Sequence, residues 1–368
     1  MRITIDSIAT VVPEPSYTTE DLLHAGGSRL SPELREMVHR LGVEKRHSVY
    51  ANYADVLFRG ASPERTSSAS RMGTDVARRC LQSAGSNPGD IGILIACTQS
   101  PSRLVPGLAP ELMALVDELP RDILHLSLQG QGCSTLLKAI DVARLFLLAN
   151  PTKRALIVGA EALSPYSSPL AAPRYGSFRE AQTREDTQRT HDAVHAFLFG
   201  DGAVALLIAS DGEGPAMGPM THLTNIAQGD VHLGRLEGGG SDEPALNGRP
   251  RYWLESNLPE RVADYASKTL RRMMEDPKSP ITSADQAAHV LIHTGSVKIL
   301  DRVCQSLDID VASPRVAPCY DVLSRHGNVA SVAIGFMLAD AVRKARGSIL
   351  MATFGLSFSA SVGVLTAA

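Results

Sequence analysis

Along the chain, short and nearly continuous runs of apolar residues alternate with longer segments in which apolar residues recur at the period of a helix. Apolar runs of about four to eight residues bounded by turn residues are typical of strands. The runs predict strands at residues 91–98, 123–128, 155–159, 204–209, 288–293 and 349–353, and the longer segments predict helices at 134–148 and 329–346. Because polar residues do not alternate within these strands, we expect helices on both faces of the sheet and therefore a layered α/β fold.

Three kinds of landmark each occur twice in the chain: a residue that ends a strand, a residue that follows glycine and opens a helix, and a glycine that ends the next strand. The pairs are Cys97 with His293, Cys133 with Asn328, and Gly159 with Gly355. The members of each pair lie about 195 residues apart, and such a constant spacing predicts a duplicated fold. We expect two pseudo-symmetric halves, residues 1–210 and 211–368, unless the spacing is a coincidence among generic α/β patterns.

Two segments interrupt the apolar pattern. Residues 165–192 are polar, contain proline and arginine, and form an excursion between two predicted strands. This insertion either shapes an entrance or a dimer contact, or it is a plain surface loop. Residues 210–250 are rich in glycine and proline, which predicts a connection between the two halves. The FGDGA sequence at 199–203 lacks the Gly-Lys-Ser/Thr of a phosphate loop and lies between apolar runs, so it predicts a hairpin turn.

Composition and charge exclude several classes of protein. The 368 residues carry a formal charge of −3, so the chain has no general attraction for nucleic acid or for an anionic membrane. No apolar run approaches the roughly 20 residues that span a bilayer, and the first residues lack the apolar core of a signal peptide. The five cysteines are scattered without a CxxC pair, which disfavours disulfides and a zinc site and favours the cytoplasm. His191 and His195 have the spacing of a metal pair on a helix, but no third ligand accompanies them, so we expect no metal.

Cys133 is the strongest candidate for chemistry. A predicted strand runs into a Gln-Gly turn, and the cysteine follows at the first turn of a helix that is apolar on nearly every face. The unpaired N–H groups at a buried helix start stabilise a thiolate over a thiol, and they can also hold an oxyanion. The alternative is an inert core cysteine, which is the state that we expect of Cys97 and Cys304.

His293 and Asn328 extend this candidate site. The duplication puts His293 at the carboxyl edge of a central strand, where ligands collect in α/β sheets, although a lone histidine is more often structural. Asn328 alone would be read as a helix N-cap, but the duplication makes it the counterpart of Cys133. A thiolate, an imidazole and an amide NH₂ that converge on one point suit acyl transfer through a thioester.

Phrases along nearly the whole chain resemble ketoacyl-ACP synthase III and the type III polyketide synthases, which are condensing enzymes of the thiolase superfamily. The matching phrases are RLGVEKRH (40–47), IGILIACTQS (91–100), Gly-Cys at 132–133, LIVGAEAL (156–163), FGDGAVALLI (199–208), HTGSVKILDRV (293–303) and LSRHGNVASVAIGFMLADAV (323–342). The resemblance implies the thiolase fold, with its duplicated αβαβα layers, and a catalytic triad that falls on Cys133, His293 and Asn328.

The resemblance also implies a reaction. Cys133 would take an acyl group from a CoA or acyl-carrier-protein thioester, and His293 and Asn328 would stabilise the enolate that forms as a malonyl-type extender loses CO₂. Attack of this carbanion on the acyl group is a Claisen condensation, as in polyketide, antibiotic or fatty acid biosynthesis. The N–H of Cys133 is expected to share an oxyanion hole with a backbone N–H near Gly355 and Leu356. No cofactor beyond the phosphopantetheine thioester is implied, and the protein is expected to be a homodimer.

Three other positions bear on the substrate. Glu36 stands where the family carries an aromatic residue that holds the CoA adenine together with an arginine, which Arg40 retains. This change favours a carrier-bound donor over free CoA. Lys298 matches a basic position that contacts phosphopantetheine or the carrier, although a solvated helix charge is an equally good interpretation. Val105 matches a loop residue that walls the acyl pocket of the neighbouring subunit.

The leading interpretation is therefore a ketosynthase of polyketide or other specialised metabolism. The alternative is an acyltransferase of the same fold that passes an acyl group from Cys133 to a hydroxyl or an amine. A non-catalytic subunit is disfavoured because the triad is intact. A papain-like protease is disfavoured because Cys133 lies in the middle of the chain.

Overall fold

The computed structural model of the chain describes residues 2–240, 250–343, 346–355 and 358–367. In these residues one mixed sheet of nine strands runs through the molecule in the order β11-β12-β13-β8-β1-β7-β6-β4-β5. Its strands are β1 (Ile3–Val11), β4 (Ile91–Cys97), β5 (Leu124–Leu128), β6 (Arg154–Glu161), β7 (Gly202–Ser210), β8 (Ala216–Thr224), β11 (Ala287–Ile292), β12 (Gly347–Gly355) and β13 (Ser359–Ala367). All six strands expected from the apolar runs are among them.

The two ends of this sheet repeat one pattern, which confirms the duplication expected from the spacing. In the N-terminal half β4 and β6 are parallel, and β7 and β1 follow antiparallel. In the C-terminal half β11 and β12 are parallel, and β13 and β8 follow antiparallel. Within the sheet, the two halves meet where β1 pairs with β8, at Thr4 and Ala216. Beside β11, in the place that corresponds to β5, the chain contributes a single backbone hydrogen bond from Val290 N to Arg315 O at 3.0 Å.

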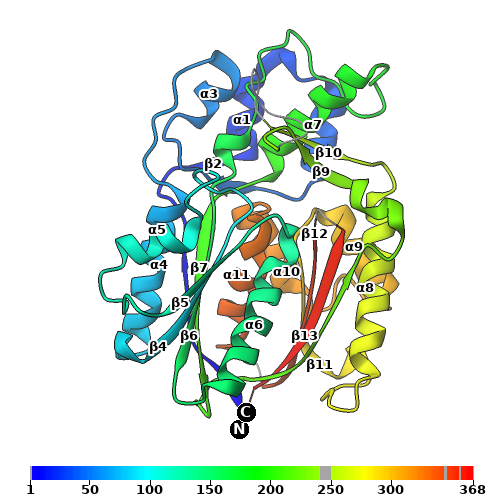
Figure 1. Cartoon of the computed structure of the whole chain (residues 1–368). Coiled ribbons are helices and arrows are strands. Elements are labelled where there is room, and N and C mark those ends of the chain that lie inside the picture. Colours follow the sequence, from blue (N-terminus) through cyan, green and yellow to red (C-terminus); the bar gives the residue numbers. More distant parts are fainter. Residues whose placement is uncertain (1, 241–249, 344–345, 356–357, 368) are drawn as a thin grey trace.

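Helices separate and cover the two halves, giving the expected αβαβα layers (Figure 1). The central helices α6 (Thr135–Ala149) and α11 (Ala333–Ala341) lie between the strands of the two halves. The helices α4 (Ala69–Ser83) and α5 (Leu108–Leu115) cover the N-terminal strands, and α8 (Leu258–Met274), α9 (Val297–Ser306) and α10 (Ala317–His326) belong to the C-terminal half. No helix of the described residues is both long enough and apolar enough to cross a membrane.

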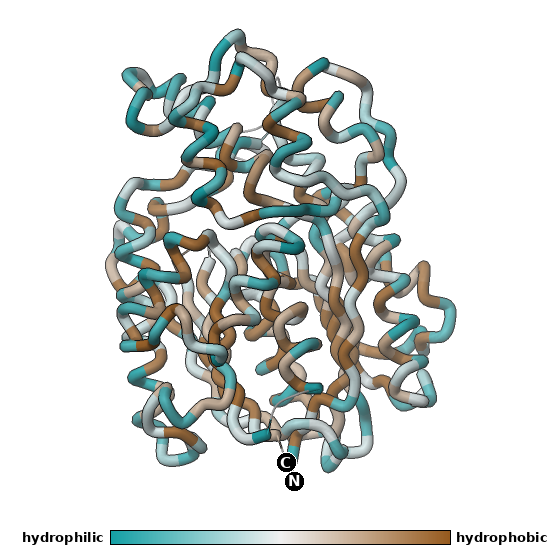
Figure 2. The backbone as a smooth tube through the Cα atoms, turned by 180° about the vertical axis from the view of Figure 1, so that it is seen from behind, coloured by the Kyte–Doolittle hydropathy of each residue, from teal (hydrophilic) through white to brown (hydrophobic). Residues whose placement is uncertain are grey.

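The core lies on both sides of the strands. Leu136 and Ile140 of α6 and Leu206 of β7 are fully buried in the cluster between the halves. In Figure 2 the strands and central helices are mostly apolar, whereas polar residues colour the outer helices and loops. Truncating such a buried leucine or isoleucine to alanine typically costs about 2–5 kcal/mol, so this packing fixes the frame that carries the site.

Segments from both halves gather into a cap at the end of the molecule opposite the chain termini (Figure 1). The elements of the cap are β2 (Ser16–Thr18), α1 (Thr19–Gly26), α2 (Pro32–His39), β3 (Lys45–His47), α3 (Tyr53–Arg59), α7 (Arg184–Leu198), β9 (Gly234–Glu237) and β10 (Arg251–Leu254). The sequence pattern did not predict this cap, because its pieces come from widely separated stretches.

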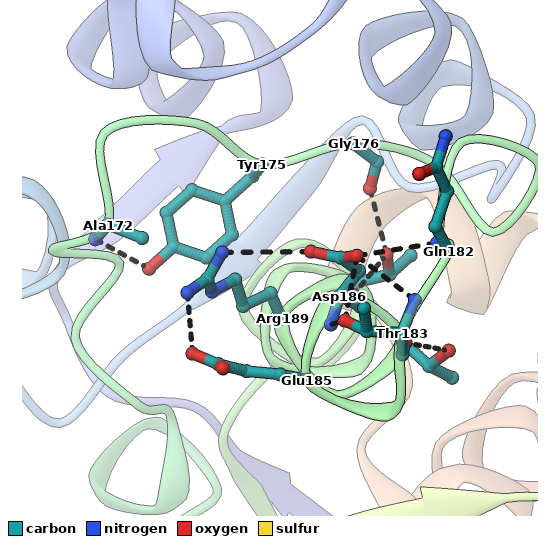
Figure 3. Close-up of polar contacts among 10 residues, drawn as sticks. Ala172, Tyr175, Gly176, Gln182, Thr183, Glu185, Asp186 and Arg189 are labelled. Atoms are coloured by element: carbon teal, nitrogen blue, oxygen red, sulfur yellow. Dashed lines mark hydrogen bonds and ion pairs between the residues drawn. The ribbon is translucent and has the colours of Figure 1, made fainter.

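The 165–192 insertion is an ordered part of the cap and leads into α7. Thr183 caps this helix: its Oγ1 accepts a hydrogen bond from Asp186 N at 3.0 Å, and the Asp186 carboxylate accepts one from Thr183 N at 3.1 Å (Figure 3). The Thr190 hydroxyl donates to Gly176 O at 2.9 Å, which ties the preceding loop to the helix. A reciprocal cap of this kind stabilises a helix start by about 1 kcal/mol.

Three expectations about the elements need correction. Residues 210–250 are more than a connection, because they include β8, a strand of the central sheet, as well as β9. The helix expected at 329–346 is a 3₁₀ turn at Ala330–Val332 followed by α11, which ends at Ala341. The FGDGA sequence is not a hairpin, since it joins helix α7 to strand β7. There the buried Asp201 carboxylate accepts hydrogen bonds from the N–H groups of Val49 and Leu163 at 2.7 and 2.6 Å.

Candidate active site

Cys133 lies in the nucleophile turn, residues 130–134, between β5 and α6. The cysteine is half-buried within a 3₁₀ turn at Gly132–Ser134, one step before α6 begins at Thr135. Gly130 and Gly132 have φ angles of +70° and +61°, in the left-handed region that residues with a Cβ rarely adopt. The glycines of the QGQGC sequence therefore permit the sharp turn that brings the thiol to the start of the helix.

The carboxyl end of β12 runs directly against this turn. A Cβ added to Gly355 would lie 2.1 Å from the backbone nitrogen of Cys133. Glycine is required here by the close approach of two backbones. Gly355 is therefore brought to Cys133 as the sequence predicted, whereas Leu356, the other residue expected at the oxyanion hole, lies outside the described residues.

His293 follows β11 and is buried beside the same end of β12. Its backbone N–H donates to Ala352 O at 2.9 Å, and its ring meets the Phe354 ring edge-on with centroids 5.5 Å apart. The ring nitrogen Nδ1 is buried and has no hydrogen-bond partner among the described residues. Burial lowers the pKa of His293 to about 3, so the imidazole is neutral at pH 7.

Asn328 lies between α10 and the turn that leads to α11. Its backbone N–H donates to Leu198 O at 2.8 Å, and its backbone carbonyl accepts from Gly200 N at 3.2 Å. Its side-chain Oδ1 accepts from Ala330 N at 2.9 Å. Because the carbonyl oxygen of the side chain is held in this way, the NH₂ group is the part of the amide that is available to donate to a ligand.

Glu161, which the sequence analysis did not single out, is a fully buried carboxylate at the end of β6. It accepts hydrogen bonds from Gln99 N at 2.9 Å, from Ser100 Oγ at 2.7 Å, and from the backbone N–H and hydroxyl of Ser331. Ser331 lies three residues beyond Asn328, so Glu161 connects the ends of β4 and β6 to the asparagine segment. The only signal in the sequence was a charged residue inside the apolar phrase LIVGAEAL.

Gln99 is a second residue that sequence reasoning missed. Its side-chain oxygen accepts from Gly132 N at 3.0 Å, and its side-chain NH₂ donates to Thr135 Oγ1 at 2.9 Å. The glutamine thus bridges the residues on either side of Cys133 and Ser134. Together with its backbone bond to Glu161, this bridge links the nucleophile turn to the buried carboxylate.

The charge around Cys133 differs from the prediction. Burial, with a further contribution from the Glu161 carboxylate, raises the pKa of Cys133 above its usual range. A helix start was expected to stabilise the thiolate, whereas the loss of solvent and the nearby Glu161 side chain favour the neutral thiol. At rest Cys133 is therefore a thiol and His293 a neutral imidazole, and the thiol must lose its proton as it reacts.

The remaining predicted positions lie on the surface. Arg40 is exposed and forms an ion pair with Glu36, one turn away along α2. Lys298 is exposed in the first turn of α9. Val105 is 84% exposed in the loop before α5. Unlike the predicted triad, these three residues are open to solvent.

The HxxxH pair belongs to an aromatic cluster in the cap. The ring of His195 lies 4.6 Å from that of Phe199 and 4.8 Å from that of Tyr252, and His191 meets Trp253 edge-on. Burial and the charges of Glu161 and Cys133 raise the pKa of Tyr252, so this tyrosine lies near the site. Among the described residues, no group of three or more His, Cys, Asp or Glu side chains is arranged to hold a metal ion.

Comparison with known proteins agrees with this geometry. Residues 34–167 match the family model of FAE1/type III polyketide synthase-like proteins. The alpha-pyrone synthesis polyketide synthase-like protein of Mycobacterium tuberculosis is 26% identical over 303 residues, which cover 80% of this chain and 68% of the relative. The beta-ketoacyl-[acyl-carrier-protein] synthase III of Sphingopyxis alaskensis is 25% identical over 313 residues, covering 84% of this chain and 82% of the relative.

A solved structure extends the likeness to the whole fold. The type III polyketide synthase domain of Steely1 from Dictyostelium superposes with a TM-score of 0.80 and 18% identity. The match covers 100% of this chain and 99% of that domain. The chain therefore has the thiolase fold of these condensing enzymes, as the resemblance implied.

Proposed function

We propose that this chain, like the condensing enzymes it is similar to, is an acyltransferase that forms a carbon–carbon bond by decarboxylative Claisen condensation. The acyl group would be carried on Cys133, and the nucleophile would come from a malonyl thioester by loss of CO₂; a β-ketoacyl thioester could serve only by losing an α-proton instead. The expected setting is polyketide or other specialised metabolism.

The observation that carries the proposal is a chain of contacts around the end of β12. The Gly355 backbone abuts Cys133 N, and the neighbouring Phe354 ring packs on His293. From the other side, Ser331 of the Asn328 segment binds Glu161, whose charge acts on Cys133. These contacts support a site in which a thiol, a neutral imidazole and an amide from the two halves of the fold act together.

The role assigned to each group follows from its protonation state and from the hydrogen bonds that it can still make. The neutral imidazole of His293 would take the thiol proton as Cys133 attacks a thioester, and it would return that proton to the CoA or carrier thiolate that leaves. In the second half-reaction, His293 and the Asn328 NH₂ would donate hydrogen bonds to the thioester oxygen of the extender as its carboxylate leaves as CO₂. The enolate charge develops on that thioester oxygen as CO₂ leaves. A hydrogen-bond donor held against the oxygen, in a site without water, stabilises the charge most at this step.

The donor of the acyl group is proposed to be carrier-bound more than free in CoA. The Arg40 guanidinium is already paired with Glu36, which weakens it as a contact for CoA phosphate. Lys298 on the surface offers an exposed cation for a phosphopantetheine phosphate or for an acidic carrier protein. We also propose that the protein is a homodimer, in which the exposed Leu104–Val105 loop contacts the neighbouring subunit.

The test separates the two half-reactions. Wild-type protein incubated with acyl-CoA and acyl-carrier donors should gain the acyl mass, and digestion should place it on the peptide that contains Cys133. The Asn328→Ala variant should still accumulate acyl-Cys133 but should release CO₂ from a labelled malonyl thioester about 10²-fold more slowly. The Cys133→Ala protein is the control for acylation.

An acyl group found on Cys97 or Cys304 instead would contradict the assignment of the nucleophile. If Asn328→Ala left product formation unchanged, the decarboxylative reaction would be wrong. The acyltransferase alternative, in which Cys133 passes its acyl group to a hydroxyl or an amine and no enolate forms, would then be the better account.

A further inference from the structure

A lysine and two serines form a hydrogen-bonded network, the Lys138–Ser359–Ser134 relay, behind the nucleophile turn. Lys138 Nζ on α6 donates to Gln131 Oε1 at 2.8 Å and to Ser359 Oγ at 3.2 Å. Ser359 Oγ lies 2.8 Å from Ser134 Oγ, and Ser134 Oγ donates to Gln131 O at 3.0 Å. No role in the proposed chemistry has been given to these residues.

The lysine fixes one direction within the relay. An ammonium group has no acceptor, so Ser359 Oγ must accept from Lys138. Both serine hydroxyls lie within hydrogen-bond distance of Gln131 O, at 3.0 Å for Ser134 and 3.4 Å for Ser359, and either serine can donate to the other. Ser134 is 0% and Ser359 1% exposed, so neither hydroxyl is accessible to attack a substrate. The relay is therefore suited to holding structure and not to chemistry of its own.

The relay joins two segments whose relative position determines the oxyanion site. Ser359 starts β13 and is the ladder partner of Gly355 at the end of β12. Ser134 and Gln131 flank Cys133 in the nucleophile turn. The relay thus fastens the β12–β13 hairpin to the turn where the Gly355 backbone meets Cys133 N. Small displacements of such donors are costly, because an oxyanion hole works only within hydrogen-bond distance.

We propose that Ser359 and Lys138 are positioning residues that hold the β12–β13 hairpin and the nucleophile turn in register for acyl transfer. The inference rests on the proposed function insofar as the reaction measured is acylation of Cys133. Removing the relay should slow the acylation of Cys133, which needs an oxyanion hole. It should leave the alkylation of Cys133, which needs only the sulfur, nearly unchanged.

The experiment compares two reactions of Cys133 by intact-protein mass: acylation by hexanoyl-CoA or a hexanoyl carrier protein, and alkylation by iodoacetamide. Ser359→Ala should be acylated at least about tenfold more slowly, while its alkylation stays within about twofold of wild type. Ser359→Thr restores the hydroxyl and should regain most of the acylation rate. Ser361→Ala is the matched control, since Ser361 is a fully buried serine of the same strand whose Oγ lies 2.8 Å from His222 Nδ1.

Lys138→Met tests the other end of the relay. The Lys138 side chain is half-buried, so the fold should tolerate its replacement more readily than that of the fully buried Ser359. It should also slow acylation, and the double variant with Ser359→Ala should be no slower than Ser359→Ala alone, because both changes break one network. Acylation at the wild-type rate in both single variants would overturn the proposal. Equal losses in acylation and alkylation would also overturn it, since they indicate general loss of structure.

Amide hydrogen exchange provides a readout that does not depend on the reaction. Peptides that contain Gly132–Ser134 and Thr353–Gly355 should exchange faster in Ser359→Ala and Lys138→Met than in wild type or Ser361→Ala. If the wild-type protein accepts no acyl group from either donor, the proposed function fails. The positioning role is then judged by exchange alone, and unchanged exchange at both segments would refute it.

Discussion

At the scale of single residues, the state of the Cys133 proton has a direct consequence for its reactivity. Burial and Glu161 raise the pKa of this thiol, so its thiolate fraction is still growing at pH values where an ordinary cysteine is fully ionised. We expect the rate of alkylation of Cys133 by iodoacetamide to keep rising well above pH ~8.5, the usual thiol pKa. The measurement is an intact-mass time course across about pH 6–10, with Cys133→Ala to subtract other sites.

The outcome decides between two accounts of this cysteine. A rate that levels off near neutral pH would mean that the start of α6 stabilises the thiolate, as the sequence predicted. The prediction from sequence used only what is local, the glycine turn and the apolar helix. Glu161 lies 28 positions away in the chain, and its hydrogen-bond donors include residues 99, 100 and 331, so its influence on Cys133 appears only in the folded molecule.

At the scale of elements, Glu161 holds together the ends of two strands and the turn before α11. A glutamine in its place has one acceptor oxygen, and its NH₂ would face donors of Gln99 and Ser331. We expect Glu161→Gln to lower the free energy of unfolding by about 2–4 kcal/mol, because buried donors lose their acceptor. Urea denaturation followed by circular dichroism measures this change.

Glu185→Gln is the matched control, because Glu185 is an exposed carboxylate paired with Arg189 along α7. It should alter the free energy of unfolding by no more than about 0.5 kcal/mol. A Glu161→Gln protein as stable as the control would show that the hydrogen bonds to the buried carboxylate contribute nothing net to the fold.

Four of the strands that the sequence predicted share one physical property, burial on both faces. β4, β6, β7 and β12 are buried along nearly their whole length, so their apolar runs are continuous. β8 is half-buried at almost every position and contains glycine and proline, so nothing in its pattern distinguished it from a loop. The helix predicted at 329–346 is longer than α11, because an apolar run in the sequence does not show where the backbone enters and leaves the helix.

At the scale of the whole molecule, β5 is an open edge of the central sheet. It pairs only with β4, and Leu124 within it is 53% exposed. An exposed apolar edge strand favours pairing with another chain, and a second copy would extend the sheet across a two-fold axis. We expect light scattering to give the mass of a dimer at micromolar concentration and that of a monomer for a Leu124→Glu, His125→Glu variant.

Val311→Glu provides the comparison for this variant, since Val311 is similarly exposed but lies beyond α9 in the other half. It should leave the dimer intact. A wild-type protein of monomeric mass would refute the proposal, and so would a β5 variant that remains dimeric. The duplication itself was visible in the sequence because three landmark pairs kept one spacing, but no local pattern tells which sheet edge is left open.

The contact between Gly355 and Cys133 also limits which amino acids can occupy position 355 in an active protein. A Cβ at position 355 would lie 2.1 Å from the backbone nitrogen of Cys133. Any side chain at this position would therefore collide with the backbone of the nucleophile. A library that samples all amino acids at this position should therefore return glycine alone from a selection for activity. This side of the site is closed to variation, so new substrates must be accommodated elsewhere, above all at the cap, where Leu198 of α7 contacts Asn328 without holding the nucleophile.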